Sequence, residues 1–291
     1  MPELPEVEVT RRRIEPLLLD RPIRQLVTTG DSYLFLTPPG RLRRGLRGRA
    51  VRKLGRRGKY LVAELGDGSR LVVHLGMTGQ LFGSGASSVR LLSATARSAL
   101  APEEQHDFRP DAHTHLQFRF EDGSPDVYFR DVRKFGKVLL LAPGESHPRL
   151  DRLGADALGV TGELLFAATR GRRVAIKSLL LDQAVVTGIG NIYADEALHR
   201  ARVRPTRRAT RVTRAESERL AAEVRNVLER AIESGGTSIR DYVTPDGSDG
   251  GFQEERRVYA RRGEPCLACE TPVRRVVVGQ RGTHYCPRCQ R

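Results

Sequence analysis

The first residues of the chain combine a candidate nucleophile with two candidate proton carriers. The chain opens with the residues MPELPEVE. Removal of Met1 would turn the ring nitrogen of Pro2 into a terminal secondary amine, and α-amino groups titrate near pH ~8. A useful fraction of such an amine is unprotonated at neutral pH, so it can attack an electrophilic carbon and form a Schiff base. Glu3 adjoins the amine and Glu6 lies on the same face of a helical turn, so both carboxylates could move protons there.

An ordinary helix start is the structural alternative for this stretch. Proline in the first helical turn is pre-organised for the helix, and glutamates there complement the positive end of the helix dipole. Taken alone, the stretch is more often structural. The rest of the sequence must therefore decide between the two interpretations.

The four cysteines form a candidate metal site in the last 26 residues. Cys266 and Cys269 form one CxxC pair, and Cys286 and Cys289 form a second pair after sixteen intervening residues. Two such pairs presented by a hairpin supply four thiolates to one zinc ion. Four protein ligands leave no open coordination position, so one structural Zn²⁺ is expected. Two disulfides are the alternative, and they are disfavoured because the sequence shows no secretion signal.

The charge of the chain indicates the class of partner. The 291 residues carry a formal net charge of +15, which predicts a polyanionic partner, most often nucleic acid. A basic membrane-surface protein is the competing interpretation, but no apolar run approaches the roughly 20 residues of a membrane span. The acidic first residues are also unlike a signal peptide. A cytoplasmic protein that binds nucleic acid is therefore expected.

Periodicity divides the chain into a strand-rich half and a helical half. The pattern predicts a helix over residues 7–19 and short strands between 23 and 141. Two hairpins are expected within the strand region, at 59–74 and 116–130, and a long surface loop is expected over 83–112. Such hairpins imply a β-sandwich or flattened barrel. The linker composition of residues 142–154 marks a boundary. Helical patterns follow at 162–169, 173–182, 191–201 and 214–233, the last with a capping box over Thr213–Glu216.

Three turns carry further candidate residues. Residues 74–79 (HLGMTG) place Met77 at a tip, although methionine is usually core filler. Residues 131–136 (DVRKFG) place a cation beside an aromatic ring, although a solvated hairpin end would look the same. Residues 188–191 (GIGN) lead into a helix at Asn191, where free N–H groups can bind phosphate. A plain helix–helix turn is equally compatible with that spacing.

From Pro2 to Cys289, these motifs occur in the order found in bacterial formamidopyrimidine-DNA glycosylases, and the chain resembles this helix-two-turn-helix glycosylase family. The resemblance implies an α+β multidomain fold, with an N-terminal β-sandwich that carries an N-terminal helix, a helical helix-two-turn-helix domain and a β-hairpin zinc finger. The expected domain boundaries are 1–145, 146–250 and 251–291. The 83–112 segment is the main departure from the family pattern, so its contacts stay open.

The resemblance also implies roles for individual residues. An enzyme that acts on a base inside a duplex must rotate it out of the stack, and inserted side chains fill the gap. The implied catalytic set is Pro2 as nucleophile, Glu3 as principal acid/base, Glu6 as secondary candidate, and Lys59 and Arg281 as phosphate-binding members. The implied DNA-binding set is His74 and Asn191 on phosphates and Met77, Arg133 and Phe135 in the gap, with Arg133 facing the orphaned cytosine. Residues 237–251 resemble the loop that closes over the extruded base, but the match is loose and assigns no single residue.

The implied activity is excision of oxidised purines, 8-oxoguanine and formamidopyrimidines, followed by β,δ-elimination at the abasic site. The expected partner is damaged double-stranded DNA, with no membrane and no obligatory protein partner, and the chain is expected to be a monomer in the bacterial cytoplasm, associated with the nucleoid when bound to DNA. One alternative is an endonuclease VIII-type glycosylase for oxidised pyrimidines, whose start usually reads PEGP where this chain has Leu4. Another is a non-catalytic zinc-containing DNA-binding protein, which would not need a proline amine.

Overall fold

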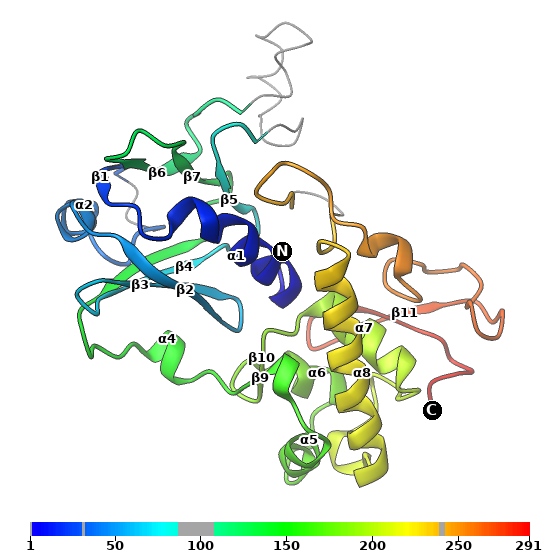
Figure 1. Ribbon diagram of the computed structural model, residues 1–291. Coiled ribbons are helices and arrows are strands. Elements are labelled where there is room, and N and C mark those ends of the chain that lie inside the picture. Colours follow the sequence, from blue (N-terminus) through cyan, green and yellow to red (C-terminus); the bar gives the residue numbers. More distant parts are fainter. Residues whose placement is uncertain (1, 31–32, 87–107, 239–241) are drawn as a thin grey trace, which may run out of the picture. The chain divides into compact units, whose positions relative to one another are not determined.

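The computed structural model describes residues 2–30, 33–86, 108–238 and 242–291 (Figure 1). Contacts divide the chain into two units, Met1–His147 with Ser234–Gly251 and Pro148–Glu233 with Phe252–Arg291. The division expected from the sequence places residues 234–250 with the helices. In the structure this segment packs with the first unit, because contacts such as the one between Thr237 and Glu6 hold it there. No local sequence pattern encodes such a contact.

The first unit is built on two antiparallel sheets. Its elements are α1 (Leu4–Leu18), β1 (Ile23–Thr28), α2 (Pro39–Leu46), β2 (Val51–Arg57), β3 (Tyr60–Leu65), β4 (Arg70–His74), β5 (Gly79–Gly83), β6 (Thr114–Phe120), β7 (Val127–Asp131) and β8 (Lys137–Leu141). One sheet has the strand order β1-β6-β7-β5 and the other β2-β3-β4-β8. Apolar side chains of both sheets form one buried cluster with Val7, Ile14 and Leu18 of α1. The expected sandwich with an N-terminal helix is confirmed.

Helix α1 begins at Leu4, three residues before the expected start. Glu3 is the reason, because its side chain and that of Glu6 form a reciprocal capping box around the first turn. The helix then continues past Pro16 to Leu18. Glu3 and Glu6 therefore stabilise the start of this helix.

Helix α2 was not expected, because only short strands were predicted between residues 23 and 141. Its N-cap and first residues, Pro38, Pro39 and Gly40, are also of types that are common in turns. Proline is nevertheless well tolerated in the first helical turn. Leu42 and Leu46 lie one turn apart and are both 0% exposed. Burial of this pair in the sandwich core therefore stabilises a helix that its local sequence disfavours.

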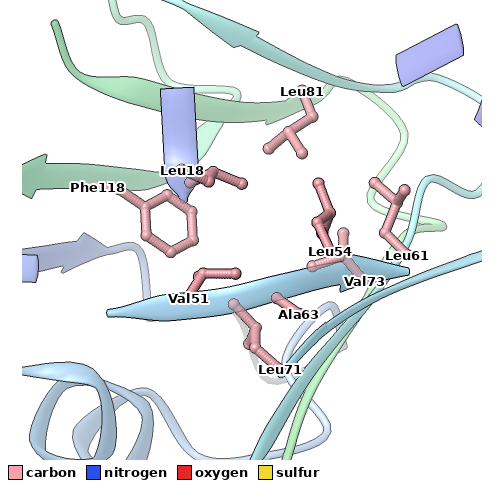
Figure 2. A pocket seen from close by; sticks show the side chains of 9 residues that line it. All are labelled: Leu18, Val51, Leu54, Leu61, Ala63, Leu71, Val73, Leu81 and Phe118. Atoms are coloured by element: carbon pink, nitrogen blue, oxygen red, sulfur yellow. The ribbon is translucent and has the colours of Figure 1, made fainter. Parts of the chain in front are cut away.

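The interior of the sandwich contains a small apolar cavity (Figure 2). Its volume is about 20 Å³, which is close to the space of a single water molecule. The cavity is thus far too small for a nucleobase, and its apolar lining could not orient one. It is lined by Leu18, Val51, Leu54, Leu61, Ala63, Leu71, Val73, Leu81 and Phe118.

The second unit is mainly helical and ends in a two-stranded hairpin. Its elements are α4 (Pro148–Asp151), β9 (Ala155–Asp156), η2 (Ala157–Gly159), α5 (Gly162–Thr169), α6 (Ile176–Leu181), β10 (Val186–Thr187), α7 (Asn191–Arg200), η3 (Ala209–Arg211), α8 (Arg214–Glu233), η4 (Phe252–Glu255), β11 (Arg274–Val278) and β12 (Arg281–Tyr285). All four expected helices are confirmed, although α6 is shorter than the pattern predicted. The capping box at the start of α8 is also confirmed, since Thr213 and Glu216 exchange hydrogen bonds there.

Most of the expected surface loop over 83–112 lies outside the described residues, which stop at Ala86 and resume at Phe108. The Phe108 ring packs on Phe82 and Tyr128, with centroid separations of 4.4 and 4.9 Å. This end of the segment is therefore anchored on the sandwich. Among the helices of the described ranges, none has the length and apolar character needed to cross a bilayer.

Candidate functional site

The amino-terminal candidates surround the start of α1. Pro2 is buried, and Glu3 beside it is 3% exposed. One oxygen of Glu6, Oε2, accepts the backbone N–H of Glu3 at 2.7 Å, and Oε1 accepts the backbone N–H of Thr237 at 2.9 Å. The structure thus brings Pro2, Glu3 and Glu6 together, with Glu6 joining the head of the chain to the 234–251 segment.

Tyr242 makes a second contact between that segment and α1. Its hydroxyl donates to the backbone oxygen of Glu6 at 3.3 Å. Burial raises the pKa of Tyr242 far above its ordinary value, so this hydroxyl stays a donor. Gly236 is needed beside it, because a Cβ there would lie 3.1 Å from Glu6 Oε1 and the residue has a φ of +85°. Gly236 and Tyr242 therefore pack tightly against Glu6.

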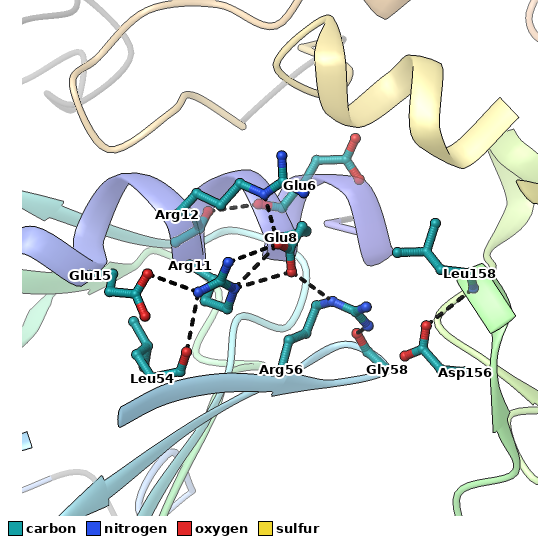
Figure 3. Close-up of polar contacts among 11 residues, drawn as sticks. Glu6, Glu8, Arg11, Arg12, Glu15, Leu54, Arg56, Gly58, Asp156 and Leu158 are labelled. Atoms are coloured by element: carbon teal, nitrogen blue, oxygen red, sulfur yellow. Dashed lines mark hydrogen bonds and ion pairs between the residues drawn. The ribbon is translucent and has the colours of Figure 1, made fainter. Parts of the chain in front are cut away.

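A cluster of charged residues fixes α1 on the neighbouring sheet (Figure 3). Glu8 accepts hydrogen bonds from Arg11 at 3.0 Å, Arg12 at 2.8 Å and Arg56 at 3.1 Å. Burial by itself would raise the pKa of Glu8, but the hydrogen bonds from these arginines outweigh it and hold the pKa below its ordinary value. Arg56 belongs to β2, so the helix that carries Glu3 is tied to the sheet that carries Lys59.

Lys59 and His74 lie at one end of that sheet. Lys59 occupies the tight turn between β2 and β3 and is 8% exposed. The next residue, Tyr60, pairs with His74 across β3 and β4, and their rings lie 4.7 Å apart. His74 Nδ1 accepts the backbone N–H of Gly76 at 3.1 Å. The two residues expected to bind phosphate therefore lie at the same end of this sheet.

The three expected gap-filling residues lie on two turns that are joined to each other. Met77 is half-buried in the turn after β4, whereas Arg133 and Phe135 are exposed in the turn after β7. The Arg133 guanidinium lies 4.8 Å from the centre of the Phe135 ring, a cation–π contact. Gly76 contacts the second turn so closely that a Cβ would lie 2.4 Å from the Gly136 nitrogen.

Asp131 is the residue that joins these turns, and it is fully buried. Its carboxylate accepts the Thr78 hydroxyl at 2.5 Å, the Gly136 N–H at 2.7 Å and the Arg133 N–H at 3.3 Å. A buried carboxylate with several donors holds its surroundings firmly. We call Met77, Arg133 and Phe135 the wedge residues. The buried Asp131 carboxylate joins the two turns that carry them.

In the second unit, the expected phosphate ligands Asn191 and Arg281 are close neighbours. Asn191 is the first residue of α7, and its Nδ2 donates to the backbone oxygen of Gly282 at 3.0 Å. Arg281 directly precedes Gly282 and is exposed at the start of β12. Gly279 and Gln280 both have positive φ values and form the turn before it. The N-terminus of α7 and the start of β12 are therefore adjacent.

A buried ion pair supports this arrangement from behind. Lys177 Nζ of α6 lies 2.7 Å from Asp195 Oδ1 of α7, and both side chains are 0% exposed. Lys177 also donates to Thr283 Oγ1 at 2.8 Å, while Asp195 Oδ2 accepts the backbone N–H of His284 at 2.7 Å. Two helices and the hairpin strand β12 are thus connected through one pair of charges.

The four cysteines meet in one cluster, with all Sγ atoms within 4.8 Å of one another. Sulfurs bound to one tetrahedral zinc ion lie about 3.8 Å apart, given Zn–S bonds of about 2.3 Å. The observed separations include 3.4 Å for Cys269–Cys286 and 4.0 Å for Cys266–Cys289, far beyond the roughly 2.0 Å of a disulfide. The cluster fits one structural zinc ion. His199 Nε2 lies 3.5 Å from Cys266 Sγ, in position to donate to a ligand thiolate.

Sequence reasoning missed the residues that support the site. Asp131 and Thr78 were seen only as members of turns, and Lys177 and Asp195 only as members of helices. Burial of a charged residue is the signal that marks them, and it needs the fold. The scarcity of lysine was a weak hint, since the chain has only five, at 53, 59, 134, 137 and 177.

Models of three protein domains match successive parts of the chain. Residues 1–138 match the formamidopyrimidine-DNA glycosylase N-terminal domain and residues 153–243 the formamidopyrimidine-DNA glycosylase H2TH domain. Residues 263–291 match the zinc finger found in FPG and IleRS. The three domains follow the order that the sequence resemblance implied.

Full-length relatives agree with the domain matches. Formamidopyrimidine-DNA glycosylases of Thioalkalivibrio sulfidiphilus and Burkholderia cenocepacia are 43% and 44% identical to the chain, with 100% of both chains covered. The crystal structure of MutM (Fpg) from Thermus thermophilus is 39% identical, with a TM-score of 0.82 over 99% of this chain and 98% of that one. A Lactococcus lactis FPG mutant in complex with Fapy-dG-containing DNA is 32% identical, with a TM-score of 0.85 and both chains fully covered. The chain therefore belongs to the formamidopyrimidine-DNA glycosylase family.

Proposed function

We propose that this chain is a bifunctional DNA glycosylase and abasic-site lyase that removes 8-oxoguanine and formamidopyrimidines from duplex DNA. Family membership over the whole length is the observation that carries the proposal. The solved relatives include complexes with Fapy-dG-containing DNA and with carbocyclic 8-oxo-G-containing DNA. The net charge of +15 suits such a partner.

Pro2 supplies the nucleophile once Met1 has been removed. Its nitrogen attacks C1′ of the damaged nucleotide, the bond from C1′ to the base breaks, and the base leaves with its electron pair and takes up a proton. Glu3 gives a proton to the opening sugar, which leaves an iminium between Pro2 and C1′. Loss of a C2′ proton then expels the 3′ phosphate, a second elimination expels the 5′ phosphate, and hydrolysis of the iminium by water frees Pro2.

Glu6 has a mainly positioning part in this proposal. Both of its carboxylate oxygens accept backbone N–H groups, one from Glu3 and one from Thr237. It therefore holds the residue next to the nucleophile and the start of the 234–251 segment in fixed places. Glu3 is the residue that transfers the proton in this proposal.

The remaining site residues hold the extruded nucleotide. Met77, Arg133 and Phe135 fill the gap, which offsets a few kcal/mol of lost stacking and pairing. The cations Lys59 and Arg281 bind phosphates, as do His74 and Asn191. Cys266, Cys269, Cys286 and Cys289 hold zinc, which fixes the hairpin that carries Arg281 and supplies no step of the reaction.

Borohydride trapping on an 8-oxoguanine duplex tests the proposal. The mature chain, with Pro2 shown by mass to be terminal, should form a covalent complex. A chain with extra residues before Pro2 should form none, and proteolytic removal of the extension back to Pro2 should restore trapping. Equal trapping by the extended chain would contradict the Pro2 mechanism.

The same preparation separates the alternatives. An endonuclease VIII-type enzyme would release thymine glycol in preference to 8-oxoguanine opposite cytosine. A non-catalytic zinc-containing DNA-binding protein would bind the duplex and leave it uncut. We expect cleavage at 8-oxoguanine, in keeping with the names of the full-length relatives.

Organisation and location complete the proposal. We assign three functional domains over residues 1–145, 146–250 and 251–291, where residues 234–250 of the second domain pack with the first unit. We also assign a monomeric state without an obligatory protein partner, and a cytoplasmic location at the nucleoid. Light scattering of the purified chain with and without duplex DNA tests the monomer. A dimer in both conditions would contradict it.

A further inference from the structure

The outer face of α2 gathers arginines that have no role in the proposed chemistry. Arg43, Arg44 and Arg47 come from the end of this helix and Arg24 from strand β1, and all four are exposed. Together with Gln25 and Leu26 they line one surface hollow. We call the four arginines the α2 arginine face.

The backbone holds this face in place. Leu42 and Leu46 are buried in the sandwich core, so the arginines between and after them must point outward. A backbone hydrogen bond of 2.8 Å from Gly48 to Ile23 fastens the end of α2 to the start of β1. Arg24 therefore stays beside the helix, on the same face of the first unit.

The charge of this face is not balanced by carboxylates in the part of the chain that the structure describes. Among the ion pairs of the described residues, none includes a member of the α2 arginine face, whereas the next arginines along the chain, Arg49 and Arg52, pair with Asp67 and Asp20. The face does have a neutral partner in Thr28, whose hydroxyl accepts from Arg43 at 2.8 Å. Four like charges held together repel one another unless an anion joins them.

Helix electrostatics explains only part of the arrangement. Cations near a helix C-terminus are favourable, and this accounts for arginines at the end of α2. It does not account for Arg24, which belongs to another element and completes the hollow. A concave surface with several guanidinium groups that lack a carboxylate is suited to phosphate, because each group offers a fork of N–H donors.

We propose that the α2 arginine face is a second binding site for the phosphate backbone of DNA, formed by residues other than those that engage the lesion. DNA is the favoured occupant because its phosphates repeat along a rigid surface and because the chain as a whole is strongly basic. The inference rests on the proposed action on DNA. Its role is to hold undamaged duplex while the enzyme searches for a lesion.

The test compares two variants that lose the same charge. R24Q/R44Q/R47Q removes three arginines of the face and leaves Arg43 on Thr28. R52Q/R172Q/R230Q removes three exposed arginines, each paired with a carboxylate. Affinity for a short undamaged duplex is measured over a range of salt concentrations, with thermal melting as the check on folding.

The face variant should bind undamaged duplex roughly tenfold more weakly or worse, with a log–log salt slope shallower by about two to three, one phosphate contact for each arginine. The control variant should keep the parental slope. Equal losses in both variants, or no loss in either, would overturn the proposal. If the face variant loses binding to polyglutamate as strongly as binding to DNA, the site serves an acidic protein segment instead.

Single-turnover excision at saturating enzyme tests the proposed function separately from the second DNA-binding site. The face variant should release 8-oxoguanine at the parental rate, since its missing residues do not touch the lesion. A parent chain without excision would refute the proposed function and leave the duplex-binding comparison intact. A face variant with slowed excision at saturation would contradict the separation of the two sites.

Discussion

Two glutamates at the head of the chain have the same chemistry but different surroundings. Glu6 uses both oxygens to accept backbone N–H groups of Glu3 and Thr237, whereas Glu3 stands directly beside Pro2 and caps the helix. The proposed function therefore gives Glu6 a positioning role and Glu3 the proton transfer. The two substitutions that follow make the difference measurable.

Glu3→Gln keeps the size of the side chain and removes its proton chemistry. We expect single-turnover release of 8-oxoguanine to fall roughly 10²- to 10⁴-fold, the usual contribution of a general acid or base. Thermal melting should change little. Glu15→Gln on the same helix, where the carboxylate pairs with Arg11, is the matched control and should keep the parental rate.

Glu6→Gln replaces one accepting oxygen with an amide that cannot accept. One of the backbone N–H groups from Glu3 or Thr237 then loses its partner in a buried place, which costs about 1–3 kcal/mol. Denaturant unfolding should show that loss, and hydrogen exchange at Thr237 should accelerate. Unchanged exchange at Thr237 would contradict the positioning role.

At the scale of elements, charged clusters attach helices to sheets and hairpins. The Glu8 cluster ties α1 to β2 (Figure 3). Because the folded pKa of Glu8 lies below the ordinary value of about 4.5, its contribution to stability is fully present above that value and is lost as pH falls through the folded pKa. Glu8→Gln should therefore flatten the fall of unfolding free energy below about pH 4.5. A parental pH profile in this variant would contradict the assignment.

The Lys177–Asp195 pair attaches α6 and α7 to the zinc-finger hairpin. Lys177→Met leaves the Asp195 charge buried without its cation, which should cost about 3–5 kcal/mol in unfolding free energy. Replacement of both residues by Met and Leu should recover part of that loss. Lys53→Met is the control, because Lys53 and Glu64 form an exposed pair 3.8 Å apart, and such pairs contribute less than about 1 kcal/mol.

Elements with their own periodicity could be predicted from sequence, and elements that depend on distant partners could not. The apolar stripe of α8 lies within one stretch, so local spacing predicted its ends. Helix α2 needs the core of the sandwich around Leu42 and Leu46, and a Pro-Pro-Gly start conceals it. The wedge residues Met77 and Arg133 could be named by family resemblance, but Asp131 behind them became visible only when its burial was known.

The division of the chain into two units was likewise predictable only where the local sequence marks it. The boundary near residue 147 coincides with a linker composition that can be read directly. The return of Ser234–Gly251 to the first unit depends on contacts with α1 across more than 200 residues, such as that between Thr237 and Glu6. Sequence order could not show it. The proposed nucleophile Pro2 belongs to the first unit, and the candidate phosphate ligands Asn191 and Arg281 belong to the second.

Zinc removal should therefore disable DNA binding without unfolding the first unit. Four residues of the hairpin strands are buried, Val278, Thr283, His284 and Tyr285, so loss of the four thiolate bonds should loosen it and make Arg281 mobile beside Asn191. We expect affinity for an 8-oxoguanine duplex to fall about tenfold or more, or about 1.4 kcal/mol. Hydrogen exchange should accelerate over residues 274–285 and stay parental over β2–β4. Chelator saturated with Zn²⁺ is the control, and re-addition of Zn²⁺ should restore binding. A metal-free chain that keeps both its exchange protection and its DNA affinity would show that the cysteine cluster does not hold the hairpin.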